Sequence, residues 1–120
     1  MMAMAQSGKS TRARVFLALS VAAFAMAACD PKQTQDAVVR RAASSTVNAV
    51  MITKLAAPQA EAATQCILTN ASQAEAEALA RDFGVMAGTL TRANIAAILA
   101  RPATQGCLSS RGVPVVQVAP

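Results

Sequence analysis

The chain has 120 residues, a net charge of +5 and 54% hydrophobic residues, but it contains no His, Trp or Tyr and only three Cys. This length allows one domain at most. Without His, the chain has no His-dependent catalytic triad, no imidazole metal ligand and no His-ligated haem. Three Phe are its only aromatic residues, so it has no platform for stacking bases and we expect no nucleic-acid partner.

The first 28 residues have the pattern of an export signal. Lys9, Arg12 and Arg14 form a basic start, and an apolar run from Val15 to Ala28 follows, interrupted only by Ser20. A helix of this run would be about 21 Å long, which is shorter than the roughly 30 Å hydrocarbon core of a membrane. The run therefore predicts a signal peptide over residues 1–28 rather than a permanent membrane anchor.

Two forms of processing fit the end of this segment. The sequence Met26-Ala27-Ala28-Cys29 resembles the lipobox of bacterial lipoproteins. This resemblance implies that the Cys29 thiol carries a diacylglyceryl group. The alternative is ordinary signal-peptidase cleavage after Ala27, with Ala25 and Ala27 in the small-residue positions.

The number of cysteines favours the first of these alternatives. Three Cys in an exported chain leave one of them unpaired in an oxidising compartment. If Cys29 is lipidated, Cys66 and Cys107 remain as a single pair, for which we expect a disulfide, with two buried thiols as the alternative. The protein would then be attached to a membrane through the acyl chains on Cys29.

The positive charge belongs largely to the signal segment. Three of the 11 basic residues lie within it and all 6 acidic residues follow it, so the chain from Cys29 onward has a net charge of 8 − 6 = +2. The charge balance therefore does not indicate a nucleic-acid surface.

Residues 29–35 are expected to form a short polar tether, and residues 36–120 one small helical domain. The first helix should begin near Asp36, whose negative charge suits a helix N-terminus. Its apolar residues recur at helical spacing, at Val39, Ala43, Val47 and Val50. Met51, Ile52 and Leu55 then extend the apolar surface around the helix end. These three residues are either buried against other helices or form a candidate patch for a protein partner.

Two further helices are predicted on either side of Asn70. Pro58 suits the first turn of a helix over about residues 59–68, which carries Ala63, Cys66 and Ile67 inward. Ser72 and Glu75 have the spacing of a capping box for the next helix. That helix has Ala76, Leu79, Ala80 and Phe83 on its apolar face and Gly84 as its C-terminal cap.

A last helix is expected between Thr91, as its N-cap, and Arg101-Pro102. Its buried face carries Ile95, Ile98 and Leu99. Pro102 should start one more turn, and residues 111–120 should form a lone strand or an extended tail. No internal repeat of useful period is present.

Together these elements predict an all-α fold, a small bundle of about four short helices after the N-terminal signal helix. The core would be thin because many of its residues are Ala, and domains of this size usually need a cross-link. A disulfide between Cys66 and Cys107 would close a loop of about 42 residues, counting both ends, and would stabilise the fold by about 4 kcal/mol.

The remaining motifs do not predict an active site. The acidic residues beyond the tether are expected in a cap (Glu75), in a pair with Arg81 (Glu77) or in solvent (Asp82) rather than in acid–base catalysis. Cys66 and Cys107 are too far apart in the sequence for a Cys-x-x-Cys redox pair. We therefore expect no catalytic residue, no cofactor and no metal site, and we predict that the protein is not an enzyme.

Three segments between residues 59 and 108 carry a second resemblance. They are Thr64-Gln65-Cys66-Ile67, Asn70-Ala71-Ser72, and Ala100-Arg101-Pro102-Ala103-Thr104 before Cys107. In these segments the chain resembles a group of small alphaproteobacterial exported proteins of unknown function. The resemblance rests on the helix boundaries and on the two Cys, and it implies no activity.

The sequence thus predicts a non-catalytic envelope lipoprotein, anchored through Cys29 and facing the periplasm, with a structural or partner-binding role. One alternative is a soluble periplasmic or secreted module that binds a small apolar ligand, in a pocket that Leu79, Phe83, Ile95 and Leu99 would line. Another is an accessory subunit of a membrane complex.

Overall fold

Five helices follow one another along residues 30–120, which are the residues that this computed structural model describes. They are α2 (Pro31–Met51), α3 (Ala57–Thr69), α4 (Gln73–Ala80), α5 (Thr89–Leu99) and α6 (Pro102–Ser110). Within these residues there is no strand, so the predicted all-α fold is confirmed for this part of the chain. The predicted signal helix and Cys29 lie outside the described residues.

The first described helix, α2, begins earlier than the sequence suggested. It starts at Pro31 rather than near Asp36, because Pro is well suited to the first position of a helix. The Asp30 carboxylate accepts a hydrogen bond from the Lys32 N–H at 3.0 Å, which satisfies one of the free donors at the helix start. Residues 31–35, predicted to be a polar tether, are therefore helical.

Proline also places the start of α3 and α6. Pro58 and Pro102 lie in the first turns of these helices, where the missing N–H removes no helical hydrogen bond. The sequence predicted only one further turn after Pro102, but α6 continues to Ser110. It does so because Thr104 and Leu108, one turn apart on the same face, are both buried.

The N-terminus of α4 has the predicted capping box. The Ser72 hydroxyl accepts from the Glu75 N–H at 3.2 Å, and the Glu75 carboxylate accepts from the Ser72 N–H at 2.8 Å. The C-terminus differs from the prediction, because the helix ends at Ala80 and the chain turns at Gly84, which has a φ of +80°. Phe83 is therefore beyond the helix and is 60% exposed rather than buried.

The start of α5 depends on a residue outside the helix. Its N-cap is Gly88, which has no side chain to accept a hydrogen bond, and the predicted cap Thr91 lies inside the helix and is buried. The Asp82 carboxylate instead accepts from the Gly88 N–H at 2.8 Å. This hydrogen bond, together with one from the Thr91 side chain, lowers the pKa of Asp82. Asp82 thereby closes the connection between α4 and α5.

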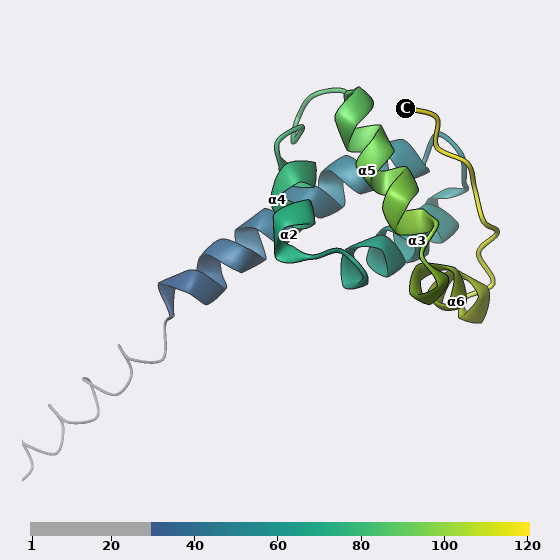
Figure 1. The fold of residues 1–120 in the computed structure, drawn as a ribbon, viewed down its shortest axis with the longest axis horizontal. Coiled ribbons are helices and arrows are strands. Elements are labelled where there is room, and N and C mark those ends of the chain that lie inside the picture. Colours follow the sequence, from purple (N-terminus) through teal and green to yellow (C-terminus); the bar gives the residue numbers. More distant parts are fainter. Residues whose placement is uncertain (1–29) are drawn as a thin grey trace, which may run out of the picture. The chain divides into compact units, whose positions relative to one another are not determined.

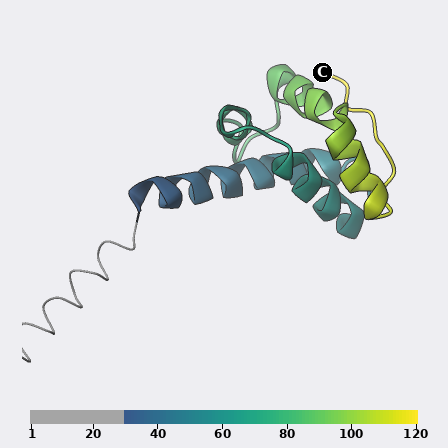
Figure 2. The ribbon, with the colours of Figure 1, turned by 60° about the horizontal axis from the view of Figure 1, so that its bottom comes forward.

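Residues 35–120 form one unit, in which α3 packs against α5 and α6, α4 packs against α5, and α5 packs against α6 (Figure 1). The C-terminal segment after α6 has no regular structure and lies beside α5 in both ribbon views (Figures 1 and 2). Two of its side chains, Val113 and Val118, are buried. The largest fully buried side chains are Met51, Ile67, Leu79, Ile95, Ile98 and Leu108. Much of the remaining core is alanine, so the core is thin, as predicted.

A disulfide joins α3 to α6 through Cys66 and Cys107, which are 41 positions apart in the sequence. The two Cα atoms are 5.7 Å apart, within the usual range for such a bond. The predicted pairing is confirmed.

Replacing Cys66 and Cys107 together by Ala should lower the free energy of unfolding by roughly 4 kcal/mol, because the unfolded chain regains the entropy of a loop of about 42 residues. Urea denaturation measures this loss. Dithiothreitol should destabilise the wild-type protein to a similar degree and leave the double variant unchanged. A loss below about 1 kcal/mol would contradict a stabilising role for the bond.

Candidate functional site

Two of the three predicted site residues are described by the structure. Cys29 lies outside the described residues, and Cys66 and Cys107 form the disulfide. Within residues 30–120, no group of three acidic, Cys or His side chains is placed to hold a metal ion. None of the described helices has both the length and the apolar character needed to cross a membrane.

The predicted partner patch does not form one exposed surface. Met51 is completely buried, Leu55 is half-buried against the core, and Ile52 is 53% exposed. The Leu55 N–H donates to the Met51 carbonyl at 2.9 Å, so the chain makes one more turn after α2 and both side chains turn inward. Ile52 is the single member of the three that remains accessible.

The residues proposed for an apolar ligand pocket have a structural role instead. Leu79, Ile95 and Leu99 are buried and belong to the hydrophobic core. Phe83, the fourth residue, is exposed because α4 ends before it. These four side chains therefore do not line a common pocket.

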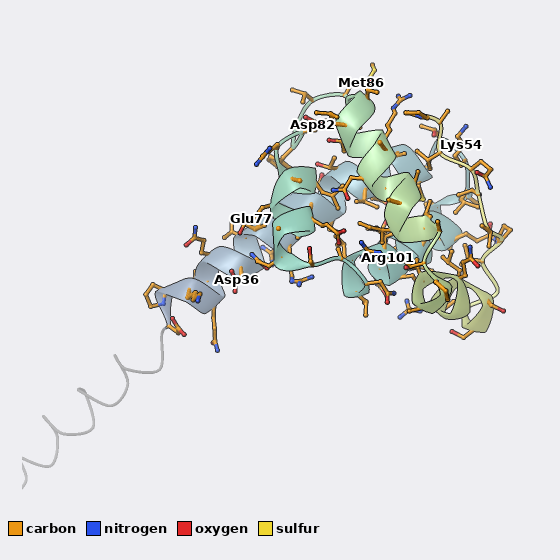
Figure 3. All side chains as sticks on the ribbon, in the orientation of Figure 1. Asp36, Lys54, Glu77, Asp82, Met86 and Arg101 are labelled. Carbon is orange, nitrogen blue, oxygen red and sulfur yellow. A yellow bond between two sulfur atoms is a disulfide. The ribbon has the colours of Figure 1, made fainter. Side chains whose placement is uncertain are left out.

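A polar junction connects the α3–α4 turn to the start of α6. The Arg101 guanidinium donates to the Asn70 carbonyl and forms a two-pronged pair with the Glu75 carboxylate, in which the Nη1–Oε2 distance is 3.0 Å. The Asn70 side chain donates to the Cys66 carbonyl at 2.8 Å, directly beside the disulfide. The junction thus links the capping box to the cross-linked helix pair, and Arg101 is labelled at this place in Figure 3.

Electrostatics at this junction favour a structural role. The hydrogen bond from Arg101, followed by the one from the Ser72 backbone, lowers the pKa of Glu75. The same pair raises the pKa of Arg101. The ionised Glu75 carboxylate accepts hydrogen bonds from both the Ser72 N–H and the Arg101 guanidinium, and it thereby fixes the turn before α4.

The sequence pattern predicted the role of Glu75 in the cap but not its partner Arg101. Glu75 and Arg101 are 26 positions apart, a separation that carries no periodic signal. The predicted pair of Glu77 with Arg81 is not formed. The Glu75–Arg101 bridge is the one ion pair among the described residues. Glu77 instead accepts a hydrogen bond from Gln73 at 3.4 Å.

Four of the seven exposed large apolar side chains among the described residues lie between the end of α4 and the first turn of α5. We call this group the loop surface, and it consists of Phe83, Val85, Met86 and Leu90, which are 60%, 66%, 86% and 86% exposed. Exposed apolar side chains that follow one another this closely in the sequence are candidates for an interaction site. The sequence pattern indicated only a connection at Val85–Leu90 and a buried position for Phe83, so it did not reveal this surface.

A groove with a volume of about 360 Å³ adjoins the loop surface. Lys54 and residues near the end of α2 form one side, and Val85, Met86 and Ala87 form another. Arg92 of α5 and the C-terminal residues Val118 and Ala119 complete it. In Figure 3, Met86 is labelled at the top of the domain and Lys54 at its upper right.

Comparison of the chain with protein-family models, with curated proteins and with solved structures finds no match.

Replacing Met51 by Ala should lower the free energy of unfolding by about 2–5 kcal/mol, because a fully buried side chain leaves a cavity. Ile52→Ala is the matched control, and it should change the stability by less than about 0.5 kcal/mol, as is usual at exposed positions. Urea denaturation of both variants checks the burial. Equal losses would contradict the inward orientation of Met51.

Glu75→Gln keeps an acceptor for the Ser72 N–H but removes the charge that pairs with Arg101. The folded-state pKa of Glu75 is lowered from 4.5, so its ionised form stabilises the fold above that pH. The contribution is lost as the pH falls through the lower folded-state pKa. Wild type should therefore be more stable than the variant at pH 7, and the difference should shrink in acid.

Urea denaturation over a series of pH values measures this convergence. Glu77→Gln serves as the control, because Glu77 has no ion-pair partner among the described residues. A difference between wild type and Glu75→Gln that does not change with pH would show that the charge is not the cause.

Proposed function

We propose that the protein is a non-catalytic lipoprotein of a bacterial cell envelope, whose helical domain faces the periplasm and acts by binding a partner. The observation that carries this proposal is the Cys66–Cys107 disulfide. It uses two of the three Cys and leaves Cys29, the last residue of the lipobox-like sequence, as the remaining thiol. Structural disulfides persist in oxidising compartments, which supports export.

Acylation at Cys29 would give firm attachment to the membrane. Each buried CH₂ group contributes about 0.8 kcal/mol, so two or three acyl chains hold a protein stably where one does not. α2 begins at Pro31, so the helical domain follows the anchored residue almost directly in the sequence.

The loop surface supports a binding role rather than a purely structural one. Its four side chains, Phe83, Val85, Met86 and Leu90, are each more than half exposed, which is costly unless they are used for contact. An accessory subunit of a membrane complex is one form of this role. The alternative of a soluble module with an apolar pocket has less support, because Leu79, Ile95 and Leu99 are part of the core.

Intact-mass spectrometry of the chain, expressed with its full leader in a bacterial host and extracted from the membrane, tests the anchor. We expect an N-terminus at Cys29 with the mass of attached acyl chains and of one disulfide. Cys29→Ser should lose the acyl mass and remain unprocessed at this site. An unmodified N-terminus at Ala28 would contradict the anchor, and a full-length cytosolic chain with free thiols would contradict export altogether.

Affinity purification in mild detergent tests partner binding. The double variant Phe83→Ser, Leu90→Ser should lose a partner that wild type retains, because both side chains are largely exposed and their replacement should not affect folding. Val38→Ser is the matched control, since Val38 is an equally exposed apolar residue on α2. Equal recovery of the partner with all three proteins would contradict a role for the loop surface.

A further inference from the structure

The groove beside the loop surface combines an apolar wall with positive charge. Its apolar wall comes from three different parts of the chain, with Val50 in α2, Val85 and Met86 in the α4–α5 connection, and Val118 in the C-terminal segment. The groove lining includes two cations, Lys54 and Arg92, and no acidic side chain. Its volume of about 360 Å³ lies within the range of small-molecule sites.

The two cations have no carboxylate partner. Glu75 and Arg101 form the one ion pair within residues 30–120, so neither Lys54 nor Arg92 is neutralised by a described side chain. The Nε atom of Arg92 is also shielded from solvent and donates to no acceptor of the described chain. A buried donor without an acceptor is costly, and both cations line the groove without an ion-pair partner among the described side chains.

The apolar wall is suited to an aliphatic chain. Met86 is 86% exposed and Val85 66% exposed. A ligand that lies along the groove would cover both side chains. Methionine adapts to irregular apolar shapes because its side chain is unbranched and flexible. The groove therefore presents cations and an adaptable apolar surface within the same small space.

From this combination we propose that the groove binds an anionic amphiphile. A carboxylate or phosphate head would pair with Arg92 and Lys54, and an alkyl chain would lie against Val85, Met86 and Val118. Free fatty acids and anionic phospholipids share this chemistry. The inference specifies a ligand class for the binding role proposed above, and it does not depend on acylation of Cys29.

Photo-crosslinking tests the site directly. The probe is dodecanoate with a diazirine at the end of its chain, added to the exported full chain in phosphatidylcholine vesicles. We expect labelling of peptides that contain Met86 or Val118, and competition by unlabelled dodecanoate but not by dodecanol. Equal competition by the uncharged alcohol would overturn the role of the cations.

Variants of the two cations sharpen the test. Arg92→Gln and Lys54→Gln should each reduce labelling about fivefold, as expected for loss of a charge-assisted contact. Lys54 is exposed, so its variant folds even if Arg92→Gln does not. Arg81→Gln is the control, because Arg81 is an exposed arginine outside the groove lining, and its labelling should match wild type. Unchanged labelling in Lys54→Gln, or labelling spread over the whole chain, would overturn the proposal.

Vesicles that contain phosphatidylglycerol distinguish the two sources of the ligand. Loss of probe labelling in these vesicles would identify a phospholipid headgroup as the occupant, and persistence of labelling would identify a free fatty acid. Protection of the groove by a co-purifying protein, with no effect of dodecanoate, would overturn the proposal in favour of a protein partner. The acylation state of Cys29 changes none of these readouts. A negative crosslinking result would therefore contradict the ligand site alone, and intact-mass spectrometry tests the lipid anchor separately.

Discussion

The bond between Cys66 and Cys107 is the constraint on which the helical domain most depends. Alanine supplies much of the core, including Ala43, Ala60 and Ala63, and such small side chains bury little apolar area when the chain folds. The cross-link compensates because it closes a loop that contains α4 and α5. The disulfide thereby keeps α4 and α5 close to the core even though each helix buries little apolar area.

The polar contacts of the domain are concentrated where that cross-link begins. The carbonyls at the C-terminus of α3 have no partners within the helix. Arginines from distant segments donate hydrogen bonds to two of these carbonyls. Arg40 of α2 donates to the Leu68 carbonyl at 3.1 Å, and Arg101 donates to that of Asn70. Positive charge at a helix C-terminus is also favoured by the helix dipole. The end of α3 is thus fixed both covalently and electrostatically.

The features that could be predicted from the sequence are those with a local cause. The capping box of Ser72 and Glu75 and the inward face of α3 both follow from spacings of three or four residues. The pairing of Cys66 with Cys107 followed from the count of Cys. The prediction for Phe83 was wrong because Gly84 indicates that a helix ends nearby but not at which residue, and α4 already ends at Ala80.

The candidate site was beyond prediction for a related reason. The groove brings together three separate segments of the chain, represented by Lys54, by Met86 with Arg92, and by Val118, and no spacing rule connects these segments. Asp82 similarly accepts from the N–H of the N-cap Gly88, whereas the predicted N-cap, Thr91, lies inside α5. Tertiary contacts of this kind are determined by packing. The export signal and the lipidation of Cys29 stay predictions.

Pro102 has a consequence that reaches beyond the helix it starts. A proline excludes the helical conformation from the residue before it, and Arg101 accordingly has an extended backbone, with φ −69° and ψ 136°. Its guanidinium is thereby directed back across the domain, to the turn before α4, instead of outward from a continuous helix. Pro102, which has neither a charge nor an N–H, thus determines that the positive charge of Arg101 lies at the Asn70 carbonyl and the Glu75 carboxylate.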